Sequence, residues 1–259
     1  MIITNKTNVP EFIFRALAKD NYSRGESEYS ISDLINPPQV RLLKKLHDKE
    51  IEEDVQEKIA SFIGTAVHEK IERAALAEKI LKPGSIFEIQ EQRFFTEMFG
   101  VIISGQIDCY DSPRNHLYDV KVTKSSKICW GEYTEWEQQL NCYAFLLSLL
   151  KYKVDHITIC AFIKDWDEKQ KLTNVKYPKF ELTLIPLRVA NLIKVKEYLE
   201  KRVQKHIEAD TSGKVAECTE KERWKNNLRC TKYCKAAKWC PQYAKIISKI
   251  ESIKQCPKT

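Results

Sequence analysis

Residues 104–124, SGQIDCYDSPRNHLYDVKVTK, decide the fold of this protein. An apolar run ends at Asp108, a turn-forming segment follows at 111–115, and a second apolar run covers 117–122. Two short apolar runs separated by turn residues are typical of neighbouring β-strands. The unusual feature is that both runs carry charged side chains where a strand would normally contribute only to a core.

The charged residues of this segment have a defined geometry. Strand side chains alternate between two faces, so Asp119 and Lys121 point to one side while Val120 and Val122 pack on the other. The turn places Asp108 near Asp119, and two adjacent carboxylates both stay ionised only beside a cation. Mg²⁺ prefers such oxygen ligands, often together with substrate phosphate. The alternative is a surface Asp–Lys pair of little energetic value.

Composition limits the possible functions. The 259 residues are 43% hydrophobic and 31% charged, which is typical of a folded globular protein. Only 7 glycines and no glycine-rich phosphate motif are present, which argues against nucleotide-binding loops. The net charge of +7 favours polyanionic partners. Without a membrane-length apolar run or signal-peptide pattern, we expect a cytoplasmic protein with no membrane partner.

Hydrophobic periodicity predicts the order of the elements. The expected order is a helix at 61–81, strands at 86–95, 100–110 and 117–123, a helix at 134–152, strands at 156–166 and 179–187, and a helix at 187–209. This order predicts an α/β fold with a mixed central sheet flanked by helices. The acidic run 50–58 is expected to be a solvated helix face or loop.

The motif residues resemble a known family. The segments GQIDCY and YDVKVTK are similar to the G-x-[IV]-D and D-x-K core of the PD-(D/E)XK nuclease superfamily. Its RecB-like branch adds an upstream Gly-x-x-x-His helix, matched by Gly64 and His68, and a downstream Gln-x-x-x-Tyr helix, matched by Gln139 and Tyr143. The four elements occur in family order across 61–147. The resemblance implies a restriction-endonuclease-like sheet and nuclease activity.

The resemblance also implies roles for the motif residues. Asp108, Asp119, His68 and the Val120 carbonyl are expected to bind Mg²⁺ or Mn²⁺. Lys121 is expected to orient or activate the attacking water. The chemistry is then metal-assisted attack of water on a phosphodiester.

The downstream motif helix contributes two further expected site residues, and the strand before the motif contributes two weaker candidates. Gln139 and Tyr143, one helical turn apart, are expected to contact the DNA backbone or Lys121, with core packing of the tyrosine as the alternative. Glu88 and Glu91 on the preceding strand are possible site residues, although an exposed strand edge is the simpler interpretation of each.

Basic and aromatic residues follow the motif. Lys124 and Lys127 are expected to touch phosphates or to be part of a solvated loop. Trp130 and Trp136 could stack on bases of a single strand, and core packing is the alternative.

Cysteines concentrate at the C-terminus. Four of them, in the pattern C-x11-C-x3-C-x5-C, match the ligand count of a zinc site or an iron–sulfur cluster: Cys218, Cys230, Cys234 and Cys240. Cys256 is expected to be spare. We therefore divide the chain into helical N-terminal elements (1–60), a nuclease core (61–213) and a Cys-rich metal-binding lobe (214–259).

The identity of that metal is open. Several RecB-like nucleases carry a [4Fe–4S] cluster held by three C-terminal cysteines and one near the N-terminus. This sequence has Asn36-Pro37-Pro38 at the comparable point, and no cysteine before Cys109. Cys218 is the candidate for the missing ligand. Zn²⁺ and [4Fe–4S] both remain possible, and the self-contained ligand set favours zinc.

The expected function is a metal-dependent DNA nuclease, most directly an exonuclease of replication, recombination or repair. Its resemblance extends to phage RecB-type exonucleases and to CRISPR-adaptation nucleases, so a bacterial or phage-infected cell is the expected setting. Single-stranded DNA or duplex ends are the expected substrate, and a helicase, recombinase or other replication protein the expected partner. Two alternatives are a non-catalytic DNA-binding subunit with this fold, and a small-molecule-binding or scaffold protein.

Overall fold

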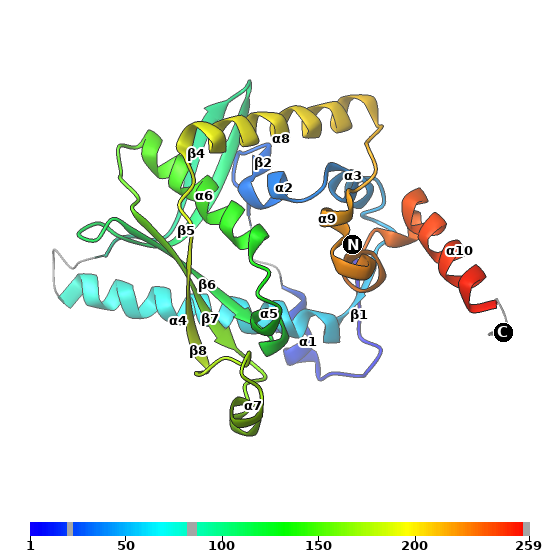
Figure 1. Ribbon diagram of the computed structural model, residues 1–259, viewed down its shortest axis with the longest axis horizontal. Helices are drawn as coiled ribbons and strands as arrows, with labels where there is room; N and C mark the ends of the chain where they lie inside the picture. The colour runs from blue at the N-terminus through cyan, green and yellow to red at the C-terminus, as the bar shows by residue number, and fades with distance from the viewer. Residues whose placement is uncertain (20–22, 82–86, 256–259) are drawn as a thin grey trace.

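The computed structural model describes the backbone of residues 1–19, 23–81 and 87–255, and their side chains except at 78–81, 87–90 and 252–255. A mixed β-sheet runs through the centre, with helices on both of its faces (Figure 1). This arrangement confirms the α/β architecture expected from the sequence. None of the helices within the described ranges is long and apolar enough to span a bilayer.

The central sheet has six strands in the described part of the chain. They are β2 (Tyr29–Ser30), β4 (Phe87–Met98), β5 (Val101–Asp111), β6 (His116–Thr123), β7 (His156–Ile163) and β8 (Leu182–Leu187). The order is β2-β5-β6-β7-β8, and β4 also pairs with β5. Strands β6 and β7 are parallel, whereas β4–β5, β5–β6 and β7–β8 are antiparallel.

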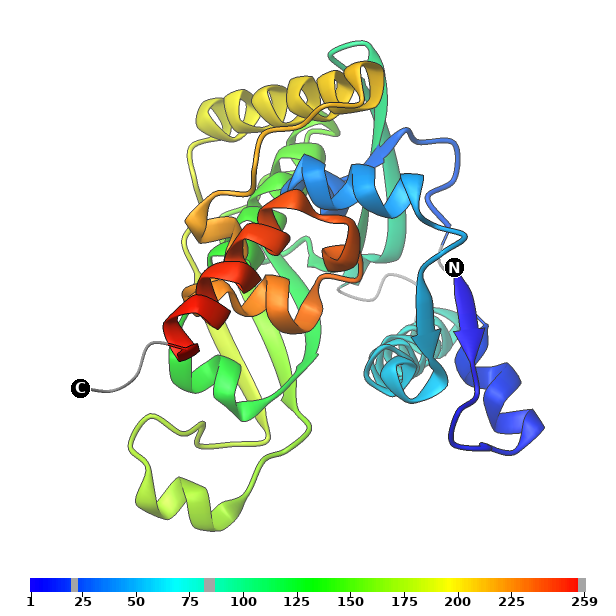
Figure 2. The same cartoon turned by 90° about the vertical axis from the view of Figure 1, so that its right-hand side faces the viewer.

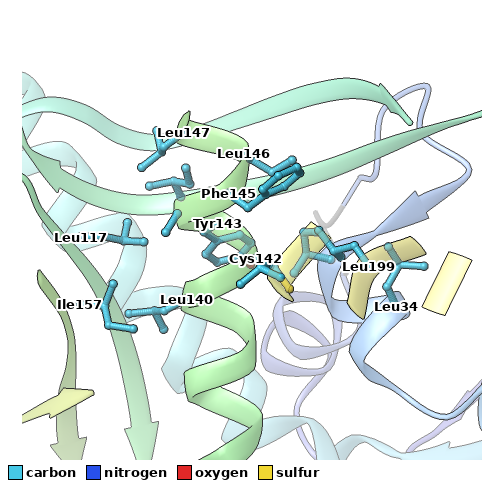
Figure 3. Packing of buried hydrophobic residues seen from close by; sticks show 14 of the residues in the cluster. Leu34, Leu117, Leu140, Cys142, Tyr143, Phe145, Leu146, Leu147, Ile157 and Leu199 are labelled. Atoms are coloured by element: carbon cyan, nitrogen blue, oxygen red, sulfur yellow. The ribbon is translucent and has the colours of Figure 1, made fainter. Parts of the chain in front are cut away.

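One face of the sheet forms the main core. Helices α2 (Ile31–Ile35), α6 (Thr134–Leu149) and α8 (Leu192–Ser212) cover it. Figure 3 shows Leu117 and Ile157 of the strands beside Leu140 of α6. Residues 140–147 of α6 are all buried, because the helix packs on the sheet with one side and on α2 and α8 with the other.

Helix α4 (Ile59–Leu81) covers part of the opposite face. It lies across the lower half of the sheet in Figure 1. It starts two residues earlier than the sequence predicts, and the expected stop at Pro83-Gly84 lies outside the described residues. Helix α8 starts at Leu192 rather than 187, because the Asn191 side chain accepts the Ile193 N–H and caps it.

The N-terminal segment contributes more than helices. It contains β1 (Ile2–Thr4), α1 (Glu11–Ala18), α3 (Pro38–Leu46), β3 (Glu52–Asp54) and the 3₁₀ turn η1 (Val55–Lys58). Strands β1 and β3 form a separate parallel pair. The expectation of a solvated acidic run is wrong at Glu53, which is 3% exposed. Its carboxylate is ion-paired with Lys235 and lies 3.9 Å from Lys58 Nζ, which compensates the burial of its charge.

The C-terminal segment packs against α3 (Figure 2). Its elements are α9 (Glu220–Arg223), the short turns η2 (Lys225–Asn227), η3 (Arg229–Tyr233) and η4 (Ala237–Trp239), and α10 (Pro241–Gln255). Trp239 stacks on His47 at the end of α3 with ring centroids 4.6 Å apart. Arg229 also donates to the Asn36 side chain, so this segment is joined to the N-terminal helices.

Candidate metal site and active centre

The site forms where two strands separate. The β5–β6 ladder has three residue pairs, from Cys109↔Tyr118 to Asp111↔His116. Immediately beyond it, Asp108 Oδ2 accepts the backbone N–H of Val120 at 2.7 Å. The carboxylate therefore satisfies a strand donor that the ladder leaves open, and this bond fixes its position between β5 and β6.

A second acid faces Asp108 from the neighbouring strand. The register of β4 and β5 pairs Gln90 with Cys109 and Gln92 with Ile107, which places Glu91 opposite Asp108. Glu91 has a φ of 45°, a left-handed conformation that is uncommon for a residue with a side chain. Such local strain is often found at functional sites.

His68 on α4 completes a three-residue group. Its Nδ1 lies 2.7 Å from Glu91 Oε1 and 3.7 Å from Asp108 Oδ2. One ligand atom from each of the three residues lies within 4.8 Å of the others. The hydrogen bond that the His68 ring donates to Glu91 raises the pKa of His68, against the effect of burial. Imidazole and carboxylate donors at this spacing could hold a divalent cation.

Asp119 and Lys121 form an ion pair beside this group. Lys121 Nζ lies 2.6 Å from Asp119 Oδ2, and the Asp119 side chain is 2% exposed. Both point to the same side of β6, as strand alternation predicts. Burial acts to lower the pKa of Lys121, but the Asp119 and Asp108 carboxylates outweigh it and raise the pKa. Lys121 is therefore a cationic donor in the metal-free site.

The electrostatics of Asp108 favour cation binding. Burial raises its pKa to about 7, the Asp119 charge adds to the effect, and Lys121 and His68 oppose it. A metal-free Asp108 is consequently protonated over part of the neutral range. A bound cation would replace that proton and remove the cost of a buried negative charge.

Further hydrogen bonds hold the metal-site acids. Gln106 donates to Glu91 Oε2 at 3.0 Å, and Arg93 donates to Gln106 Oε1 at 2.8 Å. Groups that orient ligands in this way are common around metal sites. Gly64, one turn before His68, is not required for a close approach of α4 to the sheet, because a Cβ there would meet nothing within 4 Å.

Gln139 and Tyr143 lie one turn apart on α6 and are hydrogen-bonded to each other. Gln139 Nε2 donates to the Tyr143 hydroxyl at 2.7 Å, and the tyrosine is 5% exposed within the core (Figure 3). Burial raises the pKa of Tyr143, and the Asp119 charge adds to the effect. The burial of the tyrosine bears out core packing, the alternative interpretation, and its phenol lies close enough to Asp119 to feel that charge.

The basic and aromatic segment after the motif is split between two environments. Trp136 stacks on Tyr133 at 5.5 Å and receives the Lys127 ammonium at 5.1 Å from its ring. Trp130 at the end of α5 (Ser125–Trp130) is 65% exposed. Only Trp130 of the two tryptophans therefore presents an open ring, and Lys124 is also exposed.

All four C-terminal cysteines line one small cavity of about 10 Å³, together with side chains of α3 and Arg223 and Arg229: Cys218, Cys230, Cys234 and Cys240. Cys218 is next to α3, where its Sγ donates to Gln39 Oε1 at 3.2 Å. Burial raises the pKa of Cys218 to about 12. The fold therefore brings Cys218 to α3, the helix that begins at Pro38. Cys256 lies outside the described residues.

Glu91 was only a weak candidate on the sequence, yet it lies at the centre of the site. Phe99 and Gly100, both with positive φ, form the two-residue turn between β4 and β5. Counting back from that turn pairs position 108 with position 91. The Phe-Gly turn is therefore the sequence signal that could have identified Glu91. The side chain of Glu88 lies outside the described residues.

Comparisons with known proteins give the fold. No protein-family model matches the chain. No curated protein matches it either. Among solved structures, the one described as SSO0001 superposes with a TM-score of 0.55 at 15% identity, covering 90% of this chain and 96% of its own. A phage-related exonuclease from Haemophilus somnus 129PT gives a TM-score of 0.32 at 18% identity, covering 57% and 72%. The first likeness shows a shared fold across nearly the whole chain.

Proposed function

We propose that this protein is a metal-dependent deoxyribonuclease of the PD-(D/E)XK type that hydrolyses phosphodiester bonds, most directly from DNA ends. The observation that carries the proposal is the group His68, Glu91 and Asp108, with the Asp119–Lys121 pair beside it. Four of these five residues are the motif positions that the family resemblance selects independently. Glu91 is an additional acid, supplied by β4.

The residues present fit a hard divalent cation such as Mg²⁺ or Mn²⁺. His68, Glu91 and Asp108 would hold it, with Asp119 and the Val120 carbonyl as the further ligands that the resemblance implies. A bound cation supplies charge neutralisation at the scissile phosphate and makes a bound water more acidic. The raised pKa of Asp108 supports this assignment. Burial and the Asp119 charge disfavour the ionised form of Asp108, and a bound cation is the partner that would stabilise that form.

The protein's own groups position the reactants. Lys121 is held by Asp119 and stays protonated, so its ammonium donates hydrogen bonds to the attacking water or a phosphate oxygen. As water attacks phosphorus, a new P–O bond forms and the bond to the leaving oxygen breaks, while the attacking water gives up a proton to solvent and the leaving oxygen takes one up. Lys121 then stabilises the negative charge that develops. Gln139 orients the Tyr143 hydroxyl beside Asp119 and so stiffens this side of the site.

The test is cleavage of end-labelled single-stranded and duplex DNA with Mg²⁺, Mn²⁺ or EDTA. We expect metal-dependent cleavage that Asp108→Asn, Asp119→Asn and Lys121→Met abolish. The control Asp155→Asn changes an exposed aspartate that pairs with Lys153 outside the site and should cleave normally. A ladder of products would distinguish trimming from internal cuts. DNA binding without cleavage would instead support a non-catalytic subunit.

We also propose that the four C-terminal cysteines hold one metal centre, either Zn²⁺ or [4Fe–4S]. All four cysteines line one cavity, and their number matches the ligand count of both centres. Among the described residues, only His68, Glu91 and Asp108 already have their ligand atoms within 4.8 Å of one another, so the four sulfurs would draw together when the metal binds. Arg223 and Arg229 on the cavity wall would balance the negative charge of four thiolates. The centre would join α3 to the C-terminal segment.

Metal analysis of anaerobically purified protein tests this centre. About one zinc per chain, or about four irons with sulfide and a brown colour, distinguishes the two forms. The Cys230→Ser variant should lose the metal and have a lower melting temperature. The control Cys142→Ser changes a core cysteine outside the cavity, and this variant should keep its metal. The proposal would be contradicted if the anaerobically purified protein contained neither zinc nor iron and Cys230→Ser melted at the same temperature as the unmodified protein.

A further inference from the structure

Arg93 lies on β4, close to the candidate metal site. The β4–β5 register pairs it directly with Gln106 and places Ser104 two positions away on the same face of β5. One terminal nitrogen of the guanidinium donates to Gln106 Oε1 at 2.8 Å, and the other donates to Ser104 Oγ at 3.2 Å. A planar guanidinium suits such a pair of acceptors, because its donors have a fixed spacing.

The donors of Arg93 fix the direction of the hydrogen bonds that lead to the site. A guanidinium only donates, so the Gln106 amide must turn its oxygen towards Arg93. The amide NH₂ group then faces Glu91 and donates to Oε2 at 3.0 Å. The other carboxylate oxygen, Oε1, accepts from His68 at 2.7 Å. Both oxygens of Glu91 are therefore held, and Arg93 determines the direction of one of the two bonds.

The second acceptor of Arg93 anchors the guanidinium outside the site. Ser104 is 0% exposed, and its hydroxyl lies 2.7 Å from that of Ser27. Ser27 donates its proton to the Arg24 carbonyl at 2.9 Å, so it accepts from Ser104, and Ser104 in turn accepts from Arg93. The guanidinium is thus tied both to the segment before β2 and to the metal site.

Glu91 needs this support more than an ordinary strand residue does. Its φ of 45° is a left-handed conformation, which a residue with a side chain keeps only where its surroundings hold it. Its side chain is 8% exposed and faces a second acid, Asp108. If the Gln106 amide could turn over, its oxygen would point at the Glu91 carboxylate and repel it.

Two roles are conceivable for an arginine beside a nuclease site, a direct contact to a DNA phosphate or the positioning of a metal ligand. The guanidinium is bonded at both terminal nitrogens to acceptors of the protein, which favours the second role. We propose that Arg93 is a positioning residue, which fixes the Gln106 amide and through it holds Glu91 where it binds the cation. The inference rests on the proposed function, because that function makes Glu91 a ligand.

The test measures Mn²⁺ affinity by calorimetry on the full-length protein without DNA. The variants are Arg93→Met, the conservative Arg93→Lys, Gln106→Leu, and a double variant that combines Arg93→Met with Gln106→Leu. Arg73→Met is the matched control, because this arginine is exposed on α4 and pairs with Glu69. Binding of an oligonucleotide in EDTA, at low and at high salt, is measured on the same proteins.

We expect Arg93→Met and Gln106→Leu each to weaken Mn²⁺ binding about tenfold, as is usual for groups that orient metal ligands. The double variant should also lose about tenfold, because both changes break the same chain of bonds, whereas independent effects would multiply to about hundredfold. Arg93→Lys should recover most of the affinity, since an ammonium also only donates and keeps the amide in place. Arg73→Met should bind Mn²⁺ normally.

DNA binding in EDTA distinguishes the two roles of Arg93. Loss of a phosphate contact would weaken oligonucleotide binding and reduce its salt dependence, whereas loss of a positioning residue should change neither. Normal Mn²⁺ affinity in Arg93→Met, multiplying effects in the double variant, or weaker DNA binding without weaker Mn²⁺ binding would overturn the positioning role. If Arg93→Met does not fold, Arg93→Gln replaces it, because its amide can turn either way and leaves Gln106 unfixed.

The positioning role and the nuclease fail in different ways. Metal-dependent cleavage together with full Mn²⁺ affinity in Arg93→Met leaves the nuclease standing and removes the positioning role. Weaker Mn²⁺ binding in Arg93→Met, in a protein that never cleaves DNA, leaves the positioning role standing and removes the nuclease.

Discussion

The Asp108 carboxylate accepts the backbone N–H of Val120 at 2.7 Å, in the position where the β5–β6 ladder has ended. This bond connects the two halves of the D…D-x-K motif through the main chain. It also explains why the strands can separate at the site without leaving a buried donor unsatisfied. Glu91 reaches the same carboxylate from β4, on the other edge of β5, and His68 reaches it from α4.

Removal of the lysine should separate its structural role from its catalytic role. Lys121→Met leaves the buried Asp119 without its partner, so we expect the metal-free protein to lose about 2–4 kcal/mol of stability. Added Mn²⁺ should restore more stability in this variant than in the unmodified protein, because the cation replaces the lost positive charge. Thermal unfolding with and without Mn²⁺ measures both effects. An unchanged melting temperature in EDTA would mean that the pair contributes nothing.

Metal binding should depend on pH through Asp108. Its folded pKa of about 7 means that the metal-free site holds a proton that a cation must displace. We expect Mn²⁺ affinity to rise roughly tenfold per pH unit between pH 5 and 6.5 and to level off above 7. His68, whose pKa is also raised, adds to the slope. Calorimetric titration with Mn²⁺ at several pH values measures this slope. The Asp108→Asn variant should bind Mn²⁺ more weakly, and its affinity should change less with pH.

Glu91 should matter as much as the motif acids. Glu91→Gln removes a charged ligand and the strong hydrogen bond to His68, so we expect Mn²⁺ to bind at least about tenfold more weakly. Glu97→Gln, an exposed change on the same strand, is the matched control and should bind normally. If both variants bind Mn²⁺ as the unmodified protein does, Glu91 is a neighbour of the metal and not a ligand.

Two glycines should respond in opposite directions. A Cβ on Gly105 would lie 2.7 Å from Leu146 Cδ1 and 3.0 Å from the Tyr143 ring, so Gly105→Ala should cost about 1–3 kcal/mol. Gly64→Ala, in open space within α4, should stabilise by about 0.5–1 kcal/mol through helix propensity. Chemical denaturation measures both. If Gly64→Ala is more stable but cleaves DNA poorly, the space left by the absent side chain at position 64 is needed by the DNA.

Acid should destabilise the protein through His206. This residue is 0% exposed and its Nε2 donates to the Asn36 carbonyl at 3.2 Å. Burial lowers its pKa to about 4, and the Arg202 and Arg41 charges add to the effect. The unfolded chain takes up this proton near pH 6.5, so stability falls as pH drops from 6.5 to 4, by roughly 1.4 kcal/mol per unit. His206→Gln should reduce this slope in denaturation series, and an identical slope would assign it to other groups.

The sequence predicted the central elements well because their signals are local. Alternation across 117–123 predicted that Asp119 and Lys121 share a side, and their 2.6 Å contact confirms it. Strand and helix order predicted the mixed sheet. The acidic run 50–58 was misjudged, because the ion pair that buries Glu53 comes from Lys235, far away in the chain. No local pattern reports such a partner.

The sequence by itself determined the residue types of the site and their order along the chain, since periodicity and turn residues act over a few positions. Only the tertiary structure decided which of them meet. The end of the β5–β6 ladder brings Asp108 to Val120, and the Phe99-Gly100 turn brings Glu91 to Asp108. The packing of α4 on the sheet adds His68 to these acids. These contacts depend on strand register and helix placement, which are set by the burial of the whole core.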